Sequence, residues 1–169
     1  DLMTDNPTVR RFRTEMMEFG ANLGKDLHYR TLAMADELIE NMRDAAPKDT
    51  GTLANSIRKK DVTRGGNGPG SFQEVSVLVI GGGAPTMRRT KAGHVYDYSL
   101  ANEFGTRNEV AHPFFYDTYR KYRNFGNELF AETVQEAIEE NNKLRDLRSD
   151  GSQAMVTHRG AVLNTKGVK

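Results

Sequence analysis

Apolar residues recur at helical spacing over residues 25–46, which is the clearest amphipathic stretch in the first half of the chain. Met34, Leu38 and Met42 follow one another at intervals of four, so they lie on one face of a helix, and charged residues occupy most of the opposite face. Pro47 should end this helix, because proline disfavours helical geometry in the residue before it. The pattern therefore predicts a long helix that stops just before this proline.

A weaker helical pattern precedes the long one. Pro7 follows Thr-Asp-Asn, which is typical of a helix start, and a first helix is expected from about 8 to 19. Gly20 and Gly24 have low helix propensity, and we expect them to break or bend the chain. Residues 1–24 are therefore predicted to form a separate N-terminal helical segment.

A turn should connect the long helix to the next segment. Asp49 or Thr50 can cap backbone amides, and Gly51 can adopt a positive φ angle without a Cβ penalty. Leu53 and Ile57 are four residues apart, so they face the same side of a short helical turn. This stretch indicates a fixed corner between a helix and a strand.

Alternation of apolar and polar residues then replaces the helical pattern. Residues 57–63 and 72–80 alternate with a period close to two, and the glycine-rich connector "RGGNGPGS" joins them. They predict a long antiparallel β-hairpin with a projecting tip. A long loop follows, with a third strand expected at 94–98 and a short helix, "SLANEF", that Gly105 closes.

A second long amphipathic helix is expected from about 113 to 144, with Phe115 and Tyr122 on one stripe. Beyond it, residues 148–169 are polar, basic and without periodicity, which predicts an extended C-terminal arm. These elements give an α+β fold: a long N-terminal helix, a small antiparallel sheet with a long β-hairpin, a long C-terminal helix packed on the sheet, and the arm. The folded domain is expected to span residues 25–147.

Composition limits the classes of protein to which this chain can belong. Of the 169 residues, 37% are hydrophobic, which is below the ~45–50% of typical globular domains, a reference that also counts glycine. Part of the chain is therefore not expected to be packed in its own core. No cysteine is present, which excludes disulfides and thiolate metal ligands. The longest apolar run, Val77–Ile80, is far shorter than a membrane span requires, so no membrane partner is expected.

The net charge is only +1, but the charges are segregated along the chain. Basic residues gather at 58–64, at 88–91 and after 143, whereas glutamates make one stretch of the last helix acidic. These glutamates are Glu128, Glu132, Glu136, Glu139 and Glu140. Opposed patches without a net charge allow a protein to bind copies of itself or a charged neighbour.

Few residue patterns suggest a catalytic, metal-binding or phosphate-binding site. The glycines at 81–83 follow a strand, but they lack the Lys-Ser/Thr ending of a phosphate-binding loop. His94, Asp97, Glu103 and His112 can meet in space as a metal or hydrolytic site, yet such residues beside aromatic ones are more often loop and cap residues. No two histidines have the spacing of a helical metal pair. We therefore expect no enzymatic activity, no metal and no cofactor.

Six basic residues are candidates for an interface or for contact with DNA. They lie in the hairpin or in the loop after it, and they are Lys59, Lys60, Arg64, Arg88, Arg89 and Lys91. Solvated surface, or contact with acidic residues of a neighbouring copy, explains them without base recognition, because no helix-turn-helix, zinc finger or RNA-binding sheet is evident. Passive contact with a DNA backbone is also compatible with these charges.

Two motifs, in this order, carry a resemblance to a known family. The stretch "AAPKDTGTLANSI" at 45–57 is similar to the Ala-Pro-x-Asp-Thr-Gly-x-Leu-x-x-Ser-Ile signature of a neck and tail-completion family of long-tailed phages. The stretch "YSLANEFGT" at 98–106 resembles the Tyr-x-x-x-x-Glu-Phe-Gly-Thr motif of that family, and the Pro-Phe pair at 113–114 resembles the opening of its last helix. The resemblance covers about 27–138 and leaves both ends of the chain outside the signature.

The resemblance implies a non-enzymatic virion protein. Such a subunit forms a ring, most simply of six copies, around the DNA channel where the head connector meets the tail. Its implied partners are copies of itself, the neighbouring head-completion or connector proteins, and the tail-terminator or tail-tube proteins, with non-specific contact to genomic DNA in the channel. It would be assembled in the bacterial host cytoplasm and located in the neck or tail top of the virion. The positions carried over are structural, namely Pro47, Asp49, Thr50, Gly51, Leu53, Glu103, Phe104, Gly105, Thr106 and Pro113.

Two other functions remain open from the residues alone. A small nucleic-acid-binding module that uses the basic hairpin and the C-terminal arm would bind DNA with a steep salt dependence. A hydrolase built on the histidines and acids near His94 and His112 would show activity that is lost when His112 is replaced by alanine.

Overall fold

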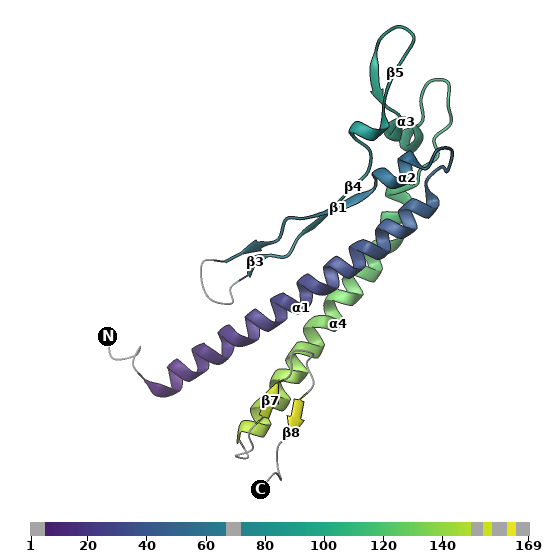
Figure 1. The fold of residues 1–169 in the computed structure, drawn as a ribbon. Coiled ribbons are helices and arrows are strands. Elements are labelled where there is room, and N and C mark those ends of the chain that lie inside the picture. Colours follow the sequence, from purple (N-terminus) through teal and green to yellow (C-terminus); the bar gives the residue numbers. More distant parts are fainter. Residues whose placement is uncertain (1–5, 67–71, 150–153, 157–161, 165–169) are drawn as a thin grey trace.

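Two long helices dominate the molecule, and the remaining elements lie along or at one end of them (Figure 1). Helix α1 spans Pro7–Ala45, and helix α4 spans Phe115–Ser149. Short antiparallel strand pairs complete the fold, so the expected mixed class of helix and sheet is confirmed. The computed structural model describes residues 6–66, 72–149, 154–156 and 162–164.

Helix α1 is one continuous helix rather than two. The side-chain oxygen of Asn6 accepts a hydrogen bond from the Thr8 amide at 2.9 Å, and Pro7 occupies the first turn, where its missing N–H costs nothing. The helix passes through Gly20 and Gly24 without interruption, so the expected break is wrong. A glycine costs about 1 kcal/mol in a helix, and the helix continues through both positions.

The end of α1 is where the sequence placed it. Ala46 adopts an extended conformation, with φ −67° and ψ 142°, and its amide donates to the Met42 carbonyl. Pro47 follows and disfavours a further helical turn. This stop directs the chain sideways into the short helix α2, Thr52–Ser56.

Helix α4 runs antiparallel to α1 and takes α1 as its main packing partner. Its contact with the first hairpin lies at its first turn, where Phe115 lies against Gly81 at the base of the hairpin. Gly126 lets the two helices approach closely, because a Cβ atom there would lie 3.2 Å from the Met34 sulfur. The helix extends to Ser149, beyond the expected end near 144.

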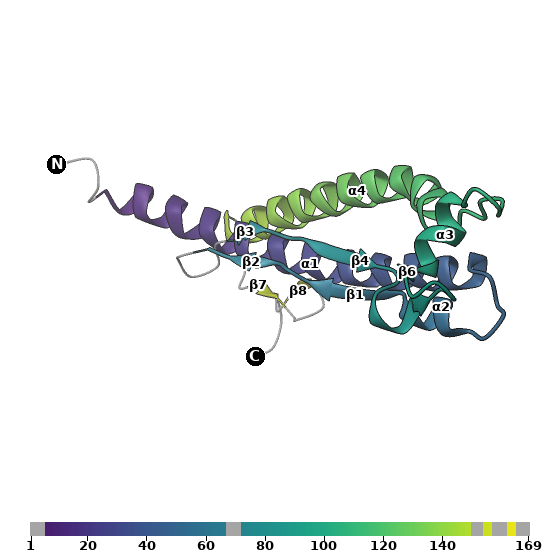
Figure 2. The same ribbon diagram turned by 90° about the horizontal axis from the view of Figure 1, so that it is seen from above.

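The predicted long hairpin is confirmed, and it packs along α1 (Figure 2). Its strands are β1 (Arg58–Asp61), β2 (Arg64–Gly65), β3 (Phe72–Glu74) and β4 (Val77–Ile80). The pairing of β1 with β4 is antiparallel and aligns Lys60 with Leu78, and the β2–β3 pair has a register shift between Arg64 and Gly65. Because side chains alternate across a strand, one face of β1–β4 turns toward α1 and the other away from it.

A second hairpin follows that the sequence did not predict. The expected third strand exists as β6 (Val95–Asp97), but it pairs with β5 (Met87–Arg89) instead of joining the first hairpin. The short 3-10 turn η1 (Ala84–Thr86) leads into β5, and helix α3 (Tyr98–Phe104) follows β6. This unit lies at the end of the molecule where α1 stops and α4 begins (Figure 1).

The C-terminal arm falls mostly outside the described residues. Two short strands within it, β7 (Ala154–Val156) and β8 (Val162–Asn164), are described and pair antiparallel. Apart from Ser149 and these strands, the residues after 148 that were predicted to form the extended arm lie outside the described residues. None of the helices in the described part of the chain combines the length and apolar character of a membrane span.

The hydrophobic core is small and lies at one end of the molecule. It forms where the end of α1, helix α2, the base of the first hairpin and the start of α4 meet. Its buried residues are Leu38, Ile39, Met42, Ala46, Leu53, Ile57 and Phe114. The two structural corners border this core, so their geometry determines how the long elements leave it.

Candidate functional site

The first corner connects α1 to the hairpin. Gly51 stands at the start of α2 with φ +72°, a conformation that favours glycine, and its carbonyl accepts from the Asn55 amide at 2.9 Å. The Thr50 hydroxyl oxygen accepts weakly from the Thr52 amide at 3.4 Å, whereas Asp49 is exposed and caps no amide in the described chain. Leu53 is 3% exposed and anchors the corner in the core.

The second corner begins at Asp97, which joins the second hairpin to α3. One carboxylate oxygen accepts from the Ser99 amide and the other from the Gly83 amide, both at 2.9 Å. Burial alone would raise the pKa of Asp97, but hydrogen bonds from the Thr86 and Ser99 side chains and from the two amides lower it overall. Asp97 therefore remains an anion that ties a turn, a strand end and a helix start together.

Glu103 is the central residue of the second corner. It is only 6% exposed, and its carboxylate accepts three backbone hydrogen bonds of 2.9 Å, from the amides of Phe114, Phe115 and Tyr116. These amides open α4 and have no partner within the helix. A negative group at this place is also favoured by the helix dipole. The carboxylate thus caps α4 from a different helix and fixes the angle between α3 and α4.

The residues after Glu103 shape the turn. Gly105 has φ +73°, and a Cβ atom there would lie 2.8 Å from the Ala111 nitrogen and 2.9 Å from the Glu109 carbonyl oxygen. The Thr106 amide donates to that same Glu109 oxygen. Phe104, by contrast, is 63% exposed, so it presents its ring to the surface rather than holding the corner from inside.

Pro113 lies two residues before the first residue of α4 and is exposed. The helix therefore begins slightly later than the proline suggested. Phe114, directly after it, is 2% exposed and inserts into the core. The Phe104 ring meets the Tyr116 ring with a centroid distance of 5.9 Å, which links the outer surfaces of α3 and α4.

The six basic candidates are divided between the two hairpins rather than gathered in one patch. Lys59 is occupied within the molecule, because its amine pairs with the Asp36 carboxylate at 2.5 Å. Arg88 is also engaged: its guanidinium lies 4.7 Å from the centre of the Tyr98 ring and donates to two nearby carbonyls. Of the six candidates, Lys60, Arg64, Arg89 and Lys91 are exposed and have no ion pair in the described chain.

The first hairpin is attached to α1 by an exposed polar contact. His28 on α1 lies 2.7 Å from the Asp61 carboxylate at the end of β1. Hydrogen bonds from the Thr63 amide and hydroxyl, followed by that from His28, lower the pKa of Asp61 to about 2. The Asp61 carboxylate is therefore ionised at neutral pH and holds both the hairpin strand and the helix.

The residues considered for hydrolysis take part in hydrogen bonds of the turns. Asp97 and Glu103 both accept backbone amides, and the His112 amide donates to the Asn102 carbonyl. Within the residues that the structure describes, no group of three or more histidines and carboxylates is placed to hold a metal ion.

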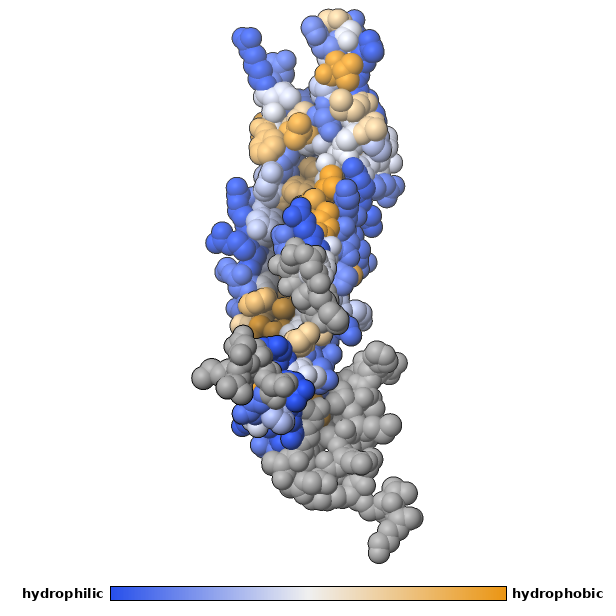
Figure 3. All heavy atoms as spheres, turned by 90° about the vertical axis from the view of Figure 1, so that its left-hand side faces the viewer, coloured by the Kyte–Doolittle hydropathy of each residue, from blue (hydrophilic) through white to orange (hydrophobic). Residues whose placement is uncertain are grey.

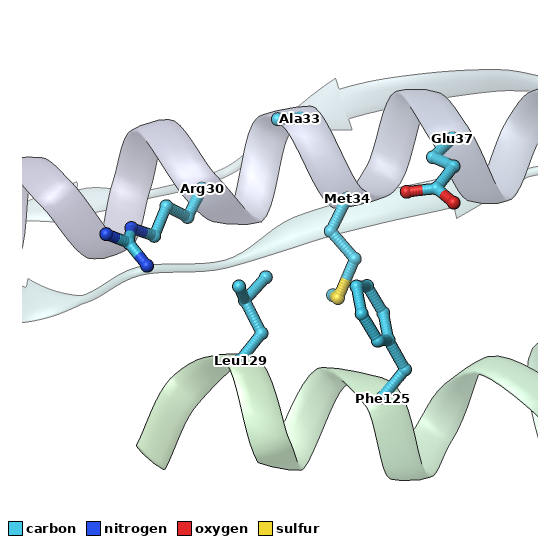
Figure 4. Close-up of a pocket in the computed structure, with 6 residues that line it drawn as sticks. All are labelled: Arg30, Ala33, Met34, Glu37, Phe125 and Leu129. Carbon is cyan, nitrogen blue, oxygen red and sulfur yellow. The ribbon is translucent and has the colours of Figure 1, made fainter. Parts of the chain in front are cut away.

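An apolar groove runs between the two long helices (Figure 4). It has a volume of about 320 Å³ and is lined by Arg30, Ala33, Met34, Glu37, Phe125 and Leu129. The Met34 side chain points toward Phe125, whose ring is 44% exposed. In this view the hairpin strands pass behind α1, and the labelled side chains that line the groove lie between α1 and α4.

Hydrogen bonds close one end of this groove. The Tyr122 hydroxyl donates to the Glu37 carboxylate at 3.0 Å and accepts from the Asn41 amide group at 2.6 Å. Burial and then the nearby Glu37 carboxylate raise the pKa of Tyr122. Further along, Arg30 on α1 pairs with Glu136 on α4. Sequence reasoning placed these residues on helices but had no signal for which helix faces would meet.

Comparison with protein-family models, with curated proteins and with solved structures finds no match for this chain.

Proposed function

We propose that this protein is a structural subunit of a tailed bacteriophage that forms a ring around the DNA channel at the neck or tail top. It joins the head connector to the tail and has no catalytic role. Six copies form the ring, and the neighbouring head-completion or connector proteins and the tail-terminator or tail-tube proteins are its partners.

The observation that supports this proposal most directly is the number of apolar side chains that the fold leaves exposed. Among the described residues, large hydrophobic side chains at least about two-fifths exposed outnumber those buried in the core. They are Val9, Phe12, Met16, Met17, Tyr29, Leu78, Met87, Val95, Tyr96, Leu100, Phe104, Val110, Tyr116, Tyr119, Phe125, Phe130 and Ile138. Single exposed apolar side chains are normal on a monomer, but so many large ones beside so small a core suit a subunit whose neighbours cover part of this surface.

The exposed residues follow the long axis of the molecule rather than marking one ligand pocket. On the face seen in Figure 3, hydrophobic patches recur between hydrophilic ones over most of the length. Leu100 and Phe104 are four residues apart on the outer side of α3, and the Phe104 ring reaches Tyr116 on α4. Such a distribution suits contacts with several neighbours at once.

The two corners supply the rigidity that a ring requires. Glu103, Gly105 and Gly51 fix the directions in which α4 and the hairpin leave the core. A closed ring tolerates little variation in these angles, because an error at each interface accumulates around the circle. The resemblance of both corners to the phage neck family supports the same role.

Binding of nucleic acid by the isolated protein is the competing function. Lys59 and Arg88 are engaged within the chain, which leaves Lys60, Arg64, Arg89 and Lys91 for partners. A free DNA-binding module would bind DNA alone with affinity that falls steeply as salt increases. In the ring, contact with DNA in the channel is passive and non-specific.

A nonsense mutation in the gene tests the proposal. We expect infected cells to accumulate DNA-filled heads and separate tails, because neither part is missing and only their joining fails. Purified wild-type protein added to that lysate should restore joined particles and plaque-forming units. Mutant lysates that still yield joined infectious particles, or that lack heads or tails altogether, would contradict the proposed role.

A further inference from the structure

We infer that neighbouring copies associate head to tail, with the outer face of the β1–β4 hairpin of one copy seated in the groove between α1 and α4 of the next. This inference rests on the proposed function and specifies the contact that builds the ring. The occupant of the groove is a second copy of this chain, because the charges of the hairpin and the groove are complementary and the two surfaces lie at the same level along the helices.

The groove has an apolar floor and an acidic border. Its exposed ring, Phe125, begins a stripe on α4 that continues at intervals of three or four residues, which keeps the stripe on one helix face. The members that follow are Glu128, Glu132, Glu136 and Glu139, and all are exposed. Glu136 pairs with Arg30, but Glu128 and Glu132 have no ion pair among the described residues. Two carboxylates are thus available to a basic partner.

The outer face of the hairpin has the complementary composition. Lys60 and Leu78 stand opposite each other in the β1–β4 pairing, and both are exposed. Their neighbours Lys59 and Val79 point toward α1, as the pairing of Lys59 with Asp36 requires. Arg64 continues the exposed basic line toward the hairpin tip. An apolar residue beside two unpaired cations therefore fits an apolar groove bordered by carboxylates.

The two surfaces lie at the same level along the long axis. Lys59 pairs with Asp36 and Asp61 with His28, so Lys60 lies beside the stretch of α1 between those partners. The same stretch of α1 faces residues 126–136 of α4, through the contact of Met34 with Gly126 and the pair of Arg30 with Glu136. A sideways displacement, combined with the rotation about the ring axis that closure requires, therefore brings Lys60 of one copy to Glu128 and Glu132 of the next without a shift along the helices.

The groove lies between α1 and α4, and the hairpin strands pass behind α1 (Figure 4). A contact between two such different surfaces is heterologous, and repeated addition of copies either closes into a ring or grows as a filament. This arrangement excludes a simple two-fold dimer through the same contact. The geometry thus accounts for how a single chain with a net charge of +1 assembles on itself.

Thiol cross-linking tests the contact directly, because the chain contains no cysteine. The double variant Leu78→Cys/Phe125→Cys places one thiol on each proposed surface, at residues that are 49% and 44% exposed. With a short bis-maleimide at high protein concentration, we expect a ladder of multimers that ends at the closed ring. On a denaturing gel, each single variant should run as the chain without cross-links, because only one of the two proposed surfaces carries a thiol. The matched control is Leu78→Cys/Ile138→Cys, because Ile138 is similarly exposed but lies on another side of α4.

Charge reversal provides a second readout. Lys60→Glu/Arg64→Glu and Glu128→Lys/Glu132→Lys should each weaken self-association about a hundredfold, because like charges then face each other. Mixing the two variants should restore assembly, since each reversed hairpin meets a reversed groove and each native hairpin meets a native groove. Sedimentation velocity at low and high salt measures both effects.

The outcomes separate this inference from the proposed function. Equal ladders from both double-cysteine variants, no ladder from either, or charge-reversed chains that assemble like wild type would overturn the docking surface. The proposed function would stand in those cases if wild-type protein still joins heads to tails in the mutant lysate. Failure of that complementation would overturn the proposed function, whatever the ladder shows. A ladder specific to Leu78→Cys/Phe125→Cys, with rescue on mixing, supports the contact.

Discussion

Replacing Glu103 with alanine tests the second corner most sharply. The carboxylate accepts three amides at the start of α4, and the Phe114 amide among them is buried. Loss of a capping side chain costs about 0.5–2 kcal/mol, and leaving a buried donor unsatisfied costs about 1–3 kcal/mol. We therefore expect Glu103→Ala to lower the free energy of unfolding by about 3 kcal/mol. Glu103→Gln should cost about half as much, because one oxygen remains to accept a hydrogen bond.

Urea unfolding followed by circular dichroism at 222 nm measures this loss, with the midpoint compared at constant slope. For a chain of this size the expected change lowers the melting temperature by about 6–12 °C. Glu40→Ala is the control, because Glu40 is an exposed acid on α1 without a hydrogen bond or ion pair in the described chain. A Glu103→Ala protein as stable as the Glu40→Ala protein would refute the account of the corner.

Two further predictions concern backbone geometry and pH. Gly105→Ala should destabilise the fold by about 2 kcal/mol or more, because a Cβ atom would clash with the Ala111 nitrogen. Gly20→Ala should instead stabilise α1 by about 0.5–1 kcal/mol, because nothing lies within 4 Å of the new methyl group. Thermal melts measure both changes, and equal effects of the two variants would contradict the role given to Gly105 in the turn. The carboxylate of Asp61 has a folded-state pKa of about 2, lowered from 3.8, so its stabilising contacts are complete above the unfolded pKa and are lost as the pH falls through the folded value. The Thr63 amide resonance of the folded protein should therefore shift with a midpoint near pH 2, and Asp61→Asn should abolish that shift; a shift that persists in the variant would assign it to another group.

Residues whose geometry is set locally were predictable from the sequence. Pro47 ends α1 through its own ring, and Gly51 and Gly105 adopt positive φ angles that their lack of a Cβ atom permits. Alternation of apolar and polar residues was also sufficient for the first hairpin, because its two strands lie close together in the chain. In each case the physical cause lies within a few residues of the feature.

Features that depend on distant partners were not predictable in the same way. The strand Met87–Arg89 has no alternating pattern, and it forms because the turn at Thr90 and Gly93 brings it beside β6. Helix α4 was expected on the sheet, but apolar spacing on a helix does not identify the surface that will cover it. Glu103 was singled out as part of a corner, yet its capping of α4 joins residues more than ten positions apart. The groove likewise exists only once α1 and α4 are paired.

Imaging of intact particles of the tailed phage that we propose to encode this chain, at a resolution that traces the backbone, tests the central claim most directly. The account predicts a closed ring of this protein between head and tail, with the DNA channel at its centre and the hairpin of each copy resting in the α1–α4 groove of the next. Particles in which the chain is absent, or in which it is present without contacting another copy of itself, would contradict it.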